Sequence, residues 1–165
     1  MRTTRIVAAV LMLISGLAIA QQAQPFSKDQ VSSKLRELYP DNADAKKEIA
    51  EALDAAAKDH KHLLLVFGAN WCFDCFALDY RFHQPAIQPI VDKNYHVLHV
   101  DIGRNDKNQD LVKKYNIPIE KGIPSLAVLD SKGHTLYTTG EFESARSTDP
   151  QVIVKFLDTW KPKQS

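Results

Sequence analysis

The sequence predicts one α/β domain, in which a central mixed β-sheet of four or more strands is flanked by helices. A short, continuous apolar run at residues 62–67 is typical of a strand buried on both faces, as in sheets that helices cover on both sides. Helix and strand patterns alternate along the chain, which favours such a layered fold. Two strand patterns near the C-terminus are joined by a tight turn, which adds a hairpin to the sheet. A chain of 165 residues can bury a core of this kind.

Two helices are predicted before the buried strand. Residues 43–59 carry apolar side chains at helical spacing, and we expect Asp41 or Asn42 to cap the start of this helix. A shorter helix is predicted upstream at residues 29–38, and it ends before Pro40 because the residue preceding a proline disfavours helical geometry.

The remaining elements follow the buried strand in alternating order. Asp149 is expected to cap the last helix, and Pro150 suits its first position. The sequence predicts a helix at 73–83, a second helical piece after Pro85 at 86–93, a strand at 95–102, a helix at 107–115, a strand at 125–130, a turn at 131–133, a strand at 134–139 and a helix at 150–161.

The first 20 residues have the layout of a secretory signal peptide. Two arginines precede an apolar run at residues 6–20, which ends in the small-x-small pattern Ala18-Ile19-Ala20. An uncleaved membrane anchor is the alternative, but the run is shorter than the roughly 20 residues that span a bilayer. We therefore expect export, cleavage after about Ala20, and a periplasmic or secreted protein.

Composition excludes several function classes. The net charge is +1, with 44% hydrophobic and 25% charged residues, which is ordinary for a globular protein. No cluster of lysines and arginines with interleaved aromatic residues is present, so the sequence gives no support for nucleic-acid binding.

The chain has two cysteines, Cys72 and Cys75, in a C-x-x-C arrangement that allows four interpretations. A structural disulfide would stabilise little, because the gain grows with the logarithm of the loop that it closes. A structural zinc ion needs four ligands, and the six histidines offer no H-x3–5-H pair to complete a site. A redox-active dithiol is the third interpretation. The fourth is a binding module in which the pair is incidental.

The position of the pair favours redox chemistry. Cys72 lies where a buried strand ends and a helix begins, and the free amide groups and dipole there favour a thiolate. Cys75 lies one turn later on the same face. We therefore expect Cys72 to be the attacking thiol and Cys75 to be the resolving thiol that releases the product.

At this point the sequence resembles the thioredoxin-like superfamily. The run LLLVFGANWCFDC is similar to the family's strand, W-C-x-x-C and helix, and Gly122-Ile123-Pro124-Ser125 matches its G-[IV]-P-[TS] loop before a strand. The resemblance covers roughly residues 45–160. The stretch FALDYRFHQPAIQPIV is most similar in pattern to the periplasmic C-terminal domain of DsbD and similar exported proteins. Together with the signal-peptide pattern, the resemblance divides the sequence into a signal peptide at 1–20, an N-terminal extension at 21–42 and a thioredoxin-like domain at 43–162.

The resemblance also implies a substrate site. In this family the proline corresponding to Pro124 is cis and lies against the dithiol, which leaves Ile123 placed for main-chain contact with an extended substrate. Trp71 is expected beside the dithiol as a further substrate contact. The stretch from Tyr115 to Pro124 is longer than usual for the family, and we expect the extra residues to border the site.

The chain departs from many thioredoxins at two buried polar positions. Val66 stands where they carry an aspartate, and Val97 stands where they carry a lysine, so their proton acceptor for the resolving cysteine is missing. Asp74, between the cysteines, is the nearest candidate substitute, although a solvated aspartate at a helix start is the favoured explanation of this residue. Phe73 and Asp74 are expected to modulate the redox potential. An acidic neighbour disfavours the thiolate, which predicts a potential nearer about −270 mV than about −120 mV.

The sequence therefore predicts an enzyme that reduces or exchanges disulfides in exported proteins without a cofactor or metal. Its expected partners are disulfide-containing proteins and an upstream thiol donor that keeps the dithiol reduced. The alternative is a peptide-binding or chaperone-like module of the same fold with little redox turnover.

Overall fold

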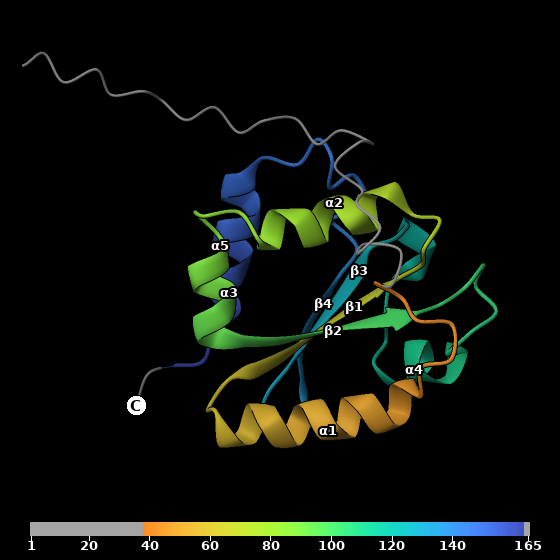
Figure 1. Ribbon diagram of the computed structural model, residues 1–165, viewed down its shortest axis with the longest axis horizontal. Coiled ribbons are helices and arrows are strands. Elements are labelled where there is room, and N and C mark those ends of the chain that lie inside the picture. The colour runs from red at the N-terminus through yellow and green to blue at the C-terminus, as the bar shows by residue number, and fades with distance from the viewer. Residues whose placement is uncertain (1–37, 164–165) are drawn as a thin grey trace, which may run out of the picture.

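The computed structural model describes residues 38–163, which form a four-stranded sheet between two layers of helices (Figure 1). The strands are β1 (His62–Gly68), β2 (Tyr95–Asp101), β3 (Ser125–Leu129) and β4 (Thr135–Thr139). The helices are α1 (Ala45–Lys58), α2 (Phe73–Phe82), α3 (Gln88–Asn94), α4 (Gln109–Lys114), the short 3-10 helix η3 (Ile119–Lys121) and α5 (Pro150–Trp160).

The sheet is mixed, in the order β2-β1-β3-β4. β1 pairs in parallel with β2, from His62 opposite Tyr95 to Gly68 opposite Asp101. β3 runs antiparallel to both β1 and β4. Every residue of β1 after His62 is buried, as expected for a strand with neighbours on both sides and helices on both faces.

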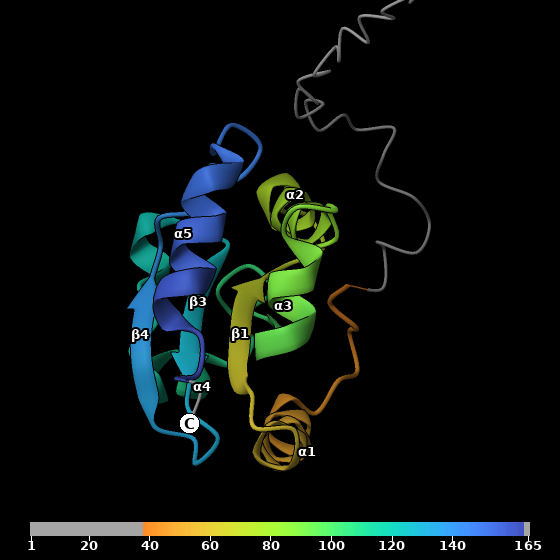
Figure 2. The same cartoon turned by 90° about the vertical axis from the view of Figure 1, so that its left-hand side faces the viewer.

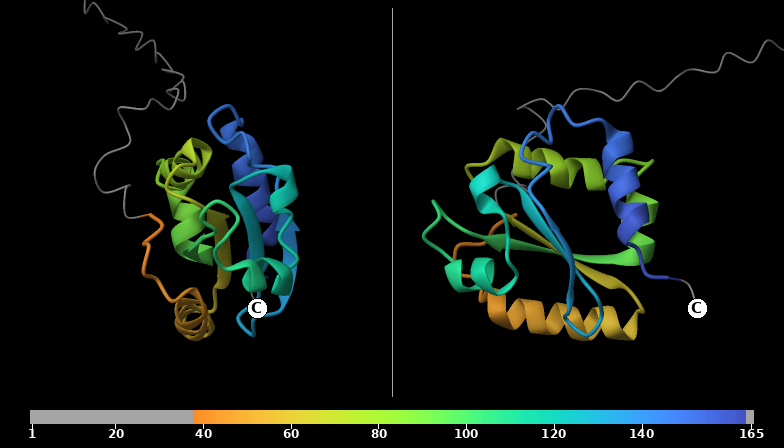
Figure 3. Two further views of the ribbon diagram at one scale, coloured as in Figure 1. Left: turned by 90° about the vertical axis from the view of Figure 1, so that its right-hand side faces the viewer. Right: turned by 180° about the vertical axis from the view of Figure 1, so that it is seen from behind.

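The alternation of side chains along β1 divides the core into two layers. Leu64 and Val66 pack with α2, α3 and α5. Leu63, Leu65 and Phe67 pack with α1 and α4 on the opposite face. The C-terminal helix closes the first layer beside the β3–β4 hairpin (Figure 3), where the rings of Tyr137 and Trp160 stack with centroids 4.5 Å apart.

Most predicted elements are confirmed, with ends displaced by one or two residues. The second helical piece begins at Gln88 rather than at residue 86, with Pro89 in its first turn. Asp149 caps α5 as predicted, since its carboxylate accepts a hydrogen bond of 2.8 Å from the Gln151 amide. The predicted helix at 29–38 falls almost entirely outside the described residues.

The predicted cap of the first helix is wrong. Asp44, not Asp41 or Asn42, accepts a hydrogen bond from the Lys47 amide at 3.2 Å and begins α1. Asp41 is instead 3.2 Å from the Lys107 ammonium group, an ion pair between distant parts of the chain that sequence spacing does not reveal.

Residues 38–44, here called the edge segment, pass round the outer strand of the sheet. Figures 1 and 2 show this segment rising from α1 along the outside of the sheet towards α2. Tyr39 meets His99 of β2 edge-on, with ring centroids 5.3 Å apart, on the side of the sheet that α2 covers. Ala45, six residues later, packs in the opposite layer. The edge segment thus covers one end of β2 and links the two layers.

A histidine with a buried Nε2 atom and a buried aspartate connect β2 to α2. Nε2 of His99 lies 3.4 Å from Oδ1 of Asp79, and both side chains are largely shielded from solvent. Burial lowers the pKa of His99 from 6.5 to about 4, and the nearby His83 contributes in the same direction. Burial raises the pKa of Asp79, which His83 partly opposes. His99 is therefore neutral near pH 7.

We expect the chain to lose stability between about pH 6.5 and pH 4 because of His99. In this range the unfolded chain protonates the histidine while the folded chain does not, so the free energy of unfolding falls as the pH falls. The difference between the ordinary pKa of 6.5 and the folded-state pKa of about 4 for His99 corresponds to about 3 kcal/mol of unfolding free energy at most. The raised pKa of Asp79 acts in the opposite sense, because the folded chain then binds a proton more readily.

Urea denaturation at several pH values tests this expectation. His99→Gln should flatten the loss of stability in this range. His60→Asn, at an exposed histidine after α1, should keep the wild-type pH dependence. An equally steep loss in His99→Gln would contradict the assignment.

Candidate active site

Cys72 is the residue that caps helix α2. β1 ends at Gly68, three residues form a turn, and Cys72 then adopts an extended conformation with φ −87° and ψ 105°. Its sulfur accepts a hydrogen bond of 3.1 Å from the Cys75 amide, one of the amides that the first turn leaves without a helical partner. These amides and the helix dipole favour negative charge on the Cys72 sulfur.

Cys72 and Cys75 form a disulfide, with their Cα atoms 5.3 Å apart. The two sulfurs belong to residues of different accessibility, since Cys72 is 5% exposed and borders a cleft whereas Cys75 is 0% exposed. An incoming thiolate therefore meets Cys72 first. Cys75 is buried in the first turn of α2.

The loop before β3 lies directly against the dithiol. The carbonyl oxygen of Ile123 is 3.5 Å from Cys72 Sγ, and the Ile123–Pro124 peptide bond is cis. The Ser125 hydroxyl donates a hydrogen bond of 2.7 Å to the Gly122 carbonyl, which fixes the loop. Gly122 has a φ of +123°, and a Cβ there would lie 2.9 Å from the Cβ of Glu143, so glycine is required.

A cleft of about 400 Å³ opens beside Cys72 and brings together most of the predicted site residues. Trp71 and Phe73 flank it as exposed aromatic side chains. Cys75 and Pro124 are buried and do not line it. The extra residues before Pro124 form η3, which borders the cleft as predicted. The cleft is lined by Trp71, Cys72, Phe73, Asp74, Asn105, Ile119, Gly122, Ile123, Glu143 and Arg146.

Trp71 is fixed although half of its surface faces solvent. Its indole N–H donates a hydrogen bond of 2.7 Å to the Gly103 carbonyl, and the Arg104 guanidinium lies over the ring at 5.8 Å from its centroid. A rigid exposed indole beside a reactive sulfur presents apolar surface to an extended chain at little cost in conformational entropy.

Asp74 is paired with Arg146, a residue from the segment between β4 and α5. Oδ1 of Asp74 accepts hydrogen bonds from the Arg146 amide at 2.9 Å and from Nε at 3.1 Å, and Oδ2 lies 3.0 Å from Nη2. The hydrogen bond and charge of Asp74 raise the pKa of Arg146. Because the guanidinium offsets the carboxylate charge, the effect of Asp74 on the Cys72 thiolate is weaker than the sequence alone suggests.

The structure also shows that the interior next to the dithiol is apolar on the β1 side. Val66 is fully buried in the layer that α2 covers, and Val97 packs against the same cluster. Neither can accept a proton from Cys75. The buried polar groups near the dithiol come instead from Tyr39, Asp79 and His99.

Several residues of this site carry no signal in the sequence. Arg146 and Glu143 belong to a stretch without periodicity, and only the fold brings them to the cleft. Asn70 marks only a break after the buried strand in the sequence, yet its amide group binds the backbone of Tyr39. Tyr39 itself stands out only as a residue near the end of a predicted helix.

Two further features of the described part of the chain bear on other functions. Within residues 38–163, no group of three or more His, Cys, Asp or Glu side chains could hold a metal ion. Over the same residues, no helix has the length and apolar character that crossing a membrane requires.

Comparison with known proteins agrees with this geometry. Similar solved structures include a disulphide isomerase from Xylella fastidiosa Temecula1, with 40% sequence identity, a TM-score of 0.69 and coverage of 73% of this chain and 94% of the relative. A DsbH oxidoreductase shares 25% identity with a TM-score of 0.52 and covers 67% and 78%. The reduced C-terminal domain of Neisseria meningitidis DsbD shares 23% identity with a TM-score of 0.55 and covers 74% and 99%, a likeness of fold.

No curated protein sequence matches the chain. The model of a protein family described as thioredoxin-like matches residues 44–131, more than half of the chain, from α1 through β3. With the capping cysteine of α2, the C-x-x-C disulfide and the loop at Pro124, this match shows that the chain belongs to the thioredoxin-like family.

Proposed function

We propose that this chain is a thiol–disulfide oxidoreductase that reduces or exchanges disulfides in exported proteins through Cys72 and Cys75. The observation that carries the proposal is the position of the pair. The two cysteines are joined at the amide end of α2, and the Cys72 residue borders an open cleft. The names of two relatives, a disulphide isomerase and an oxidoreductase, support the same chemistry.

The reaction takes place in two exchanges. In the reduced protein, the Cys72 thiolate attacks one sulfur of a client disulfide, which forms a mixed disulfide and releases the other client sulfur as a thiolate. The Cys75 thiol then gives its proton to the client thiolate just released, and its sulfur attacks Cys72 Sγ, which restores the Cys72–Cys75 disulfide and releases the second client sulfur as a thiolate. Two electrons pass from the protein to the client. An upstream dithiol returns the protein to the reduced state by the reverse exchanges.

The client is proposed to bind as an extended segment in the cleft. The support is the Ile123 carbonyl oxygen, which lies 3.5 Å from the Cys72 sulfur, in the loop that continues into Pro124. Trp71 and Phe73 supply exposed apolar surface along the same cleft. Backbone pairing of this kind is tolerant of client sequence, whereas aromatic contacts add affinity.

The site of action is proposed to be the periplasm or the medium outside the cell. The support is the signal-peptide pattern at residues 1–20, which lies outside the described residues. The proposed mature chain then consists of an extension at 21–42 and the thioredoxin-like domain at 43–162.

A second candidate is a binding or chaperone-like module with little turnover. The observation in its favour is Val66, which is buried in an apolar cluster at the position where related enzymes carry a proton acceptor. The two functions differ in whether Cys72 and Cys75 pass through repeated cycles of oxidation and reduction.

Reduction of insulin by dithiothreitol separates these candidates. We expect the wild-type protein to accelerate insulin precipitation and Cys72→Ser to fall to the uncatalysed rate, because it removes the attacking sulfur. Thr159→Ser, a conservative change on α5 outside the cleft, should retain the wild-type rate. A wild-type protein that does not accelerate precipitation would favour the binding module.

Trapping of mixed disulfides tests the roles of the two sulfurs. Cys75→Ser should accumulate covalent complexes with client proteins on a non-reducing gel, because the second exchange can no longer occur. Cys72→Ser serves as the matched variant and should trap few or none, since Cys75 is buried. Trapping by Cys72→Ser but not by Cys75→Ser would mean that Cys75 is the attacking cysteine and Cys72 the resolving one.

A further inference from the structure

The hydroxyl of Tyr39 lies beside the sulfur of Cys75, on the buried side of the dithiol. Tyr39 is 0% exposed and belongs to the same buried cluster as Cys72 and Cys75. Both groups abut Gly68 at the end of β1. A Cβ on this glycine would lie 2.7 Å from Cys75 Sγ and closer still to the Tyr39 hydroxyl oxygen. The hydroxyl and the sulfur therefore share the space that the glycine leaves open.

Two sets of contacts hold Tyr39 in this position. Its amide donates a hydrogen bond of 3.2 Å to Oδ1 of Asn70, and its carbonyl accepts one of 2.7 Å from Nδ2 of the same side chain. Asn70 is two residues before Cys72, so this pairing fixes the edge segment to the turn that carries the dithiol.

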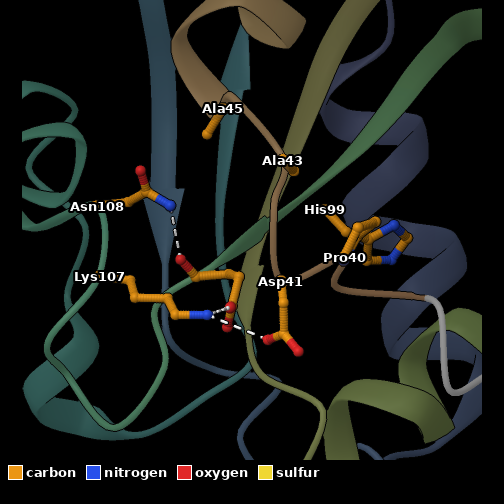
Figure 4. A pocket seen from close by; sticks show the side chains of 8 residues that line it. Pro40, Asp41, Ala43, Ala45, His99, Lys107 and Asn108 are labelled. Carbon is orange, nitrogen blue, oxygen red and sulfur yellow. Dashed lines mark hydrogen bonds and ion pairs between the residues drawn. The ribbon is translucent and has the colours of Figure 1, made fainter.

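On the other side of the edge segment, the Lys107 ammonium group lies between the carboxylates of Asp41 and Asp101, at 3.2 Å and 2.8 Å (Figure 4). These groups and His99 line a pocket of about 290 Å³. The backbone that carries Tyr39 is thus held by Asn70 and, two residues later, through Asp41 by Lys107.

The hydroxyl is a hydrogen-bond donor whose proton is unused while the disulfide is closed. Among residues 38–163 it has no hydrogen-bond partner, although it is fully buried. A buried polar group without a partner is costly, and native structures contain few of them. Burial, with contributions from the negative charges of Asp79 and Asp101, raises its pKa well above the ordinary value for tyrosine. The group therefore keeps its proton and does not act as a base.

Cys75 requires such a donor when the disulfide opens. Its sulfur then carries an electron pair and a negative charge in a place that is 0% exposed to solvent. An unpaired buried charge is strongly unfavourable. Val66, in the fully buried layer under α2, offers no polar group.

We propose that Tyr39 donates a hydrogen bond to the Cys75 sulfur whenever the Cys72–Cys75 bond is open, and so stabilises the reduced dithiol and the mixed disulfide. This inference rests on the proposed function. When a donor thiolate attacks Cys72 Sγ, the new sulfur–sulfur bond forms there and the Cys72–Cys75 bond breaks. The electron pair goes to Cys75 Sγ, and the Tyr39 O–H binds the resulting thiolate. In the reverse step the same thiolate attacks Cys72 and the hydroxyl loses its partner again.

The consequence is a contribution to the redox equilibrium with a definite sign. A hydrogen bond made only in the open form shifts the equilibrium towards the dithiol. Hydrogen bonds to charged groups contribute enough for about a tenfold change in an equilibrium constant. Tyr39→Phe, which removes only the hydroxyl, should therefore make the disulfide about tenfold harder to reduce, equal to about 30 mV.

Equilibration with glutathione buffers measures this change. We expect the wild type and Tyr39→Phe to differ about tenfold in their equilibrium constants. Tyr95→Phe is the matched control, because the Tyr95 hydroxyl is also inward-facing but donates to the Leu157 carbonyl at 2.6 Å, away from the dithiol. This control should lose stability in both redox forms and keep the wild-type constant. Tyr39→Phe should lose stability only in the reduced form.

A second readout does not depend on turnover. In Cys72→Ser, the pKa of the remaining Cys75 thiol can be followed by thiolate absorbance, and adding Tyr39→Phe should lower the ratio of thiolate to thiol about tenfold at a given pH. A change of less than twofold in either the equilibrium constant with glutathione or the ionisation constant of the Cys75 thiol would overturn the inference. A wild-type protein that fails to exchange with glutathione would instead count against the proposed function, and the thiol titration would still decide whether the contact exists.

Discussion

The hydrogen bond from the Cys75 amide to the Cys72 sulfur is the interaction on which the rest of the site depends. It makes Cys72, the proposed attacking cysteine, the cap of α2, so the same contact begins the helix and places a sulfur where backbone amides favour negative charge. The contact requires β1 to end at a fixed point, because three residues join that strand to the cap. The burial of β1 on both faces sets this point. The Cys72 sulfur is thus positioned by a strand that is buried on both faces.

The sulfurs of Cys72 and Cys75 have different surroundings, and this difference distinguishes the accessible cysteine from the buried one. Cys72 borders an open cleft that Trp71 and Phe73 also line, and a carbonyl oxygen lies 3.5 Å from its sulfur. Cys75 has no exposed surface and lies against the edge segment. The charged groups and the neutral polar groups are also separated between the two sides of the dithiol. The Arg146 pair offsets the Asp74 charge on the open side, while the neutral His99 and the hydroxyl of Tyr39 occupy the closed side.

Local patterns predicted the sheet, the helices and the dithiol because each depends on neighbours in sequence. A buried strand, the Asp149 cap and a C-x-x-C pair can all be identified within a dozen residues, whereas the same reasoning chose the wrong cap for α1. The position of Tyr39 could not be predicted in this way, since it depends on Asn70, 31 residues later, and on the edge segment passing round β2. The Asp74–Arg146 pair spans 72 residues and depends on the segment between β4 and α5. Sequence spacing therefore predicted the dithiol itself but did not predict the polar groups that surround it.

The most direct test of this account is the pKa of the Cys72 thiol in reduced Cys75→Ser, measured by the pH dependence of its alkylation rate. The account predicts a pKa clearly below the ordinary value of about 8.5, because the amide end of α2 stabilises the thiolate and Arg146 offsets the nearby carboxylate. A value at or above about 8.5 would contradict it, since the start of the helix would then give the sulfur no chemical advantage.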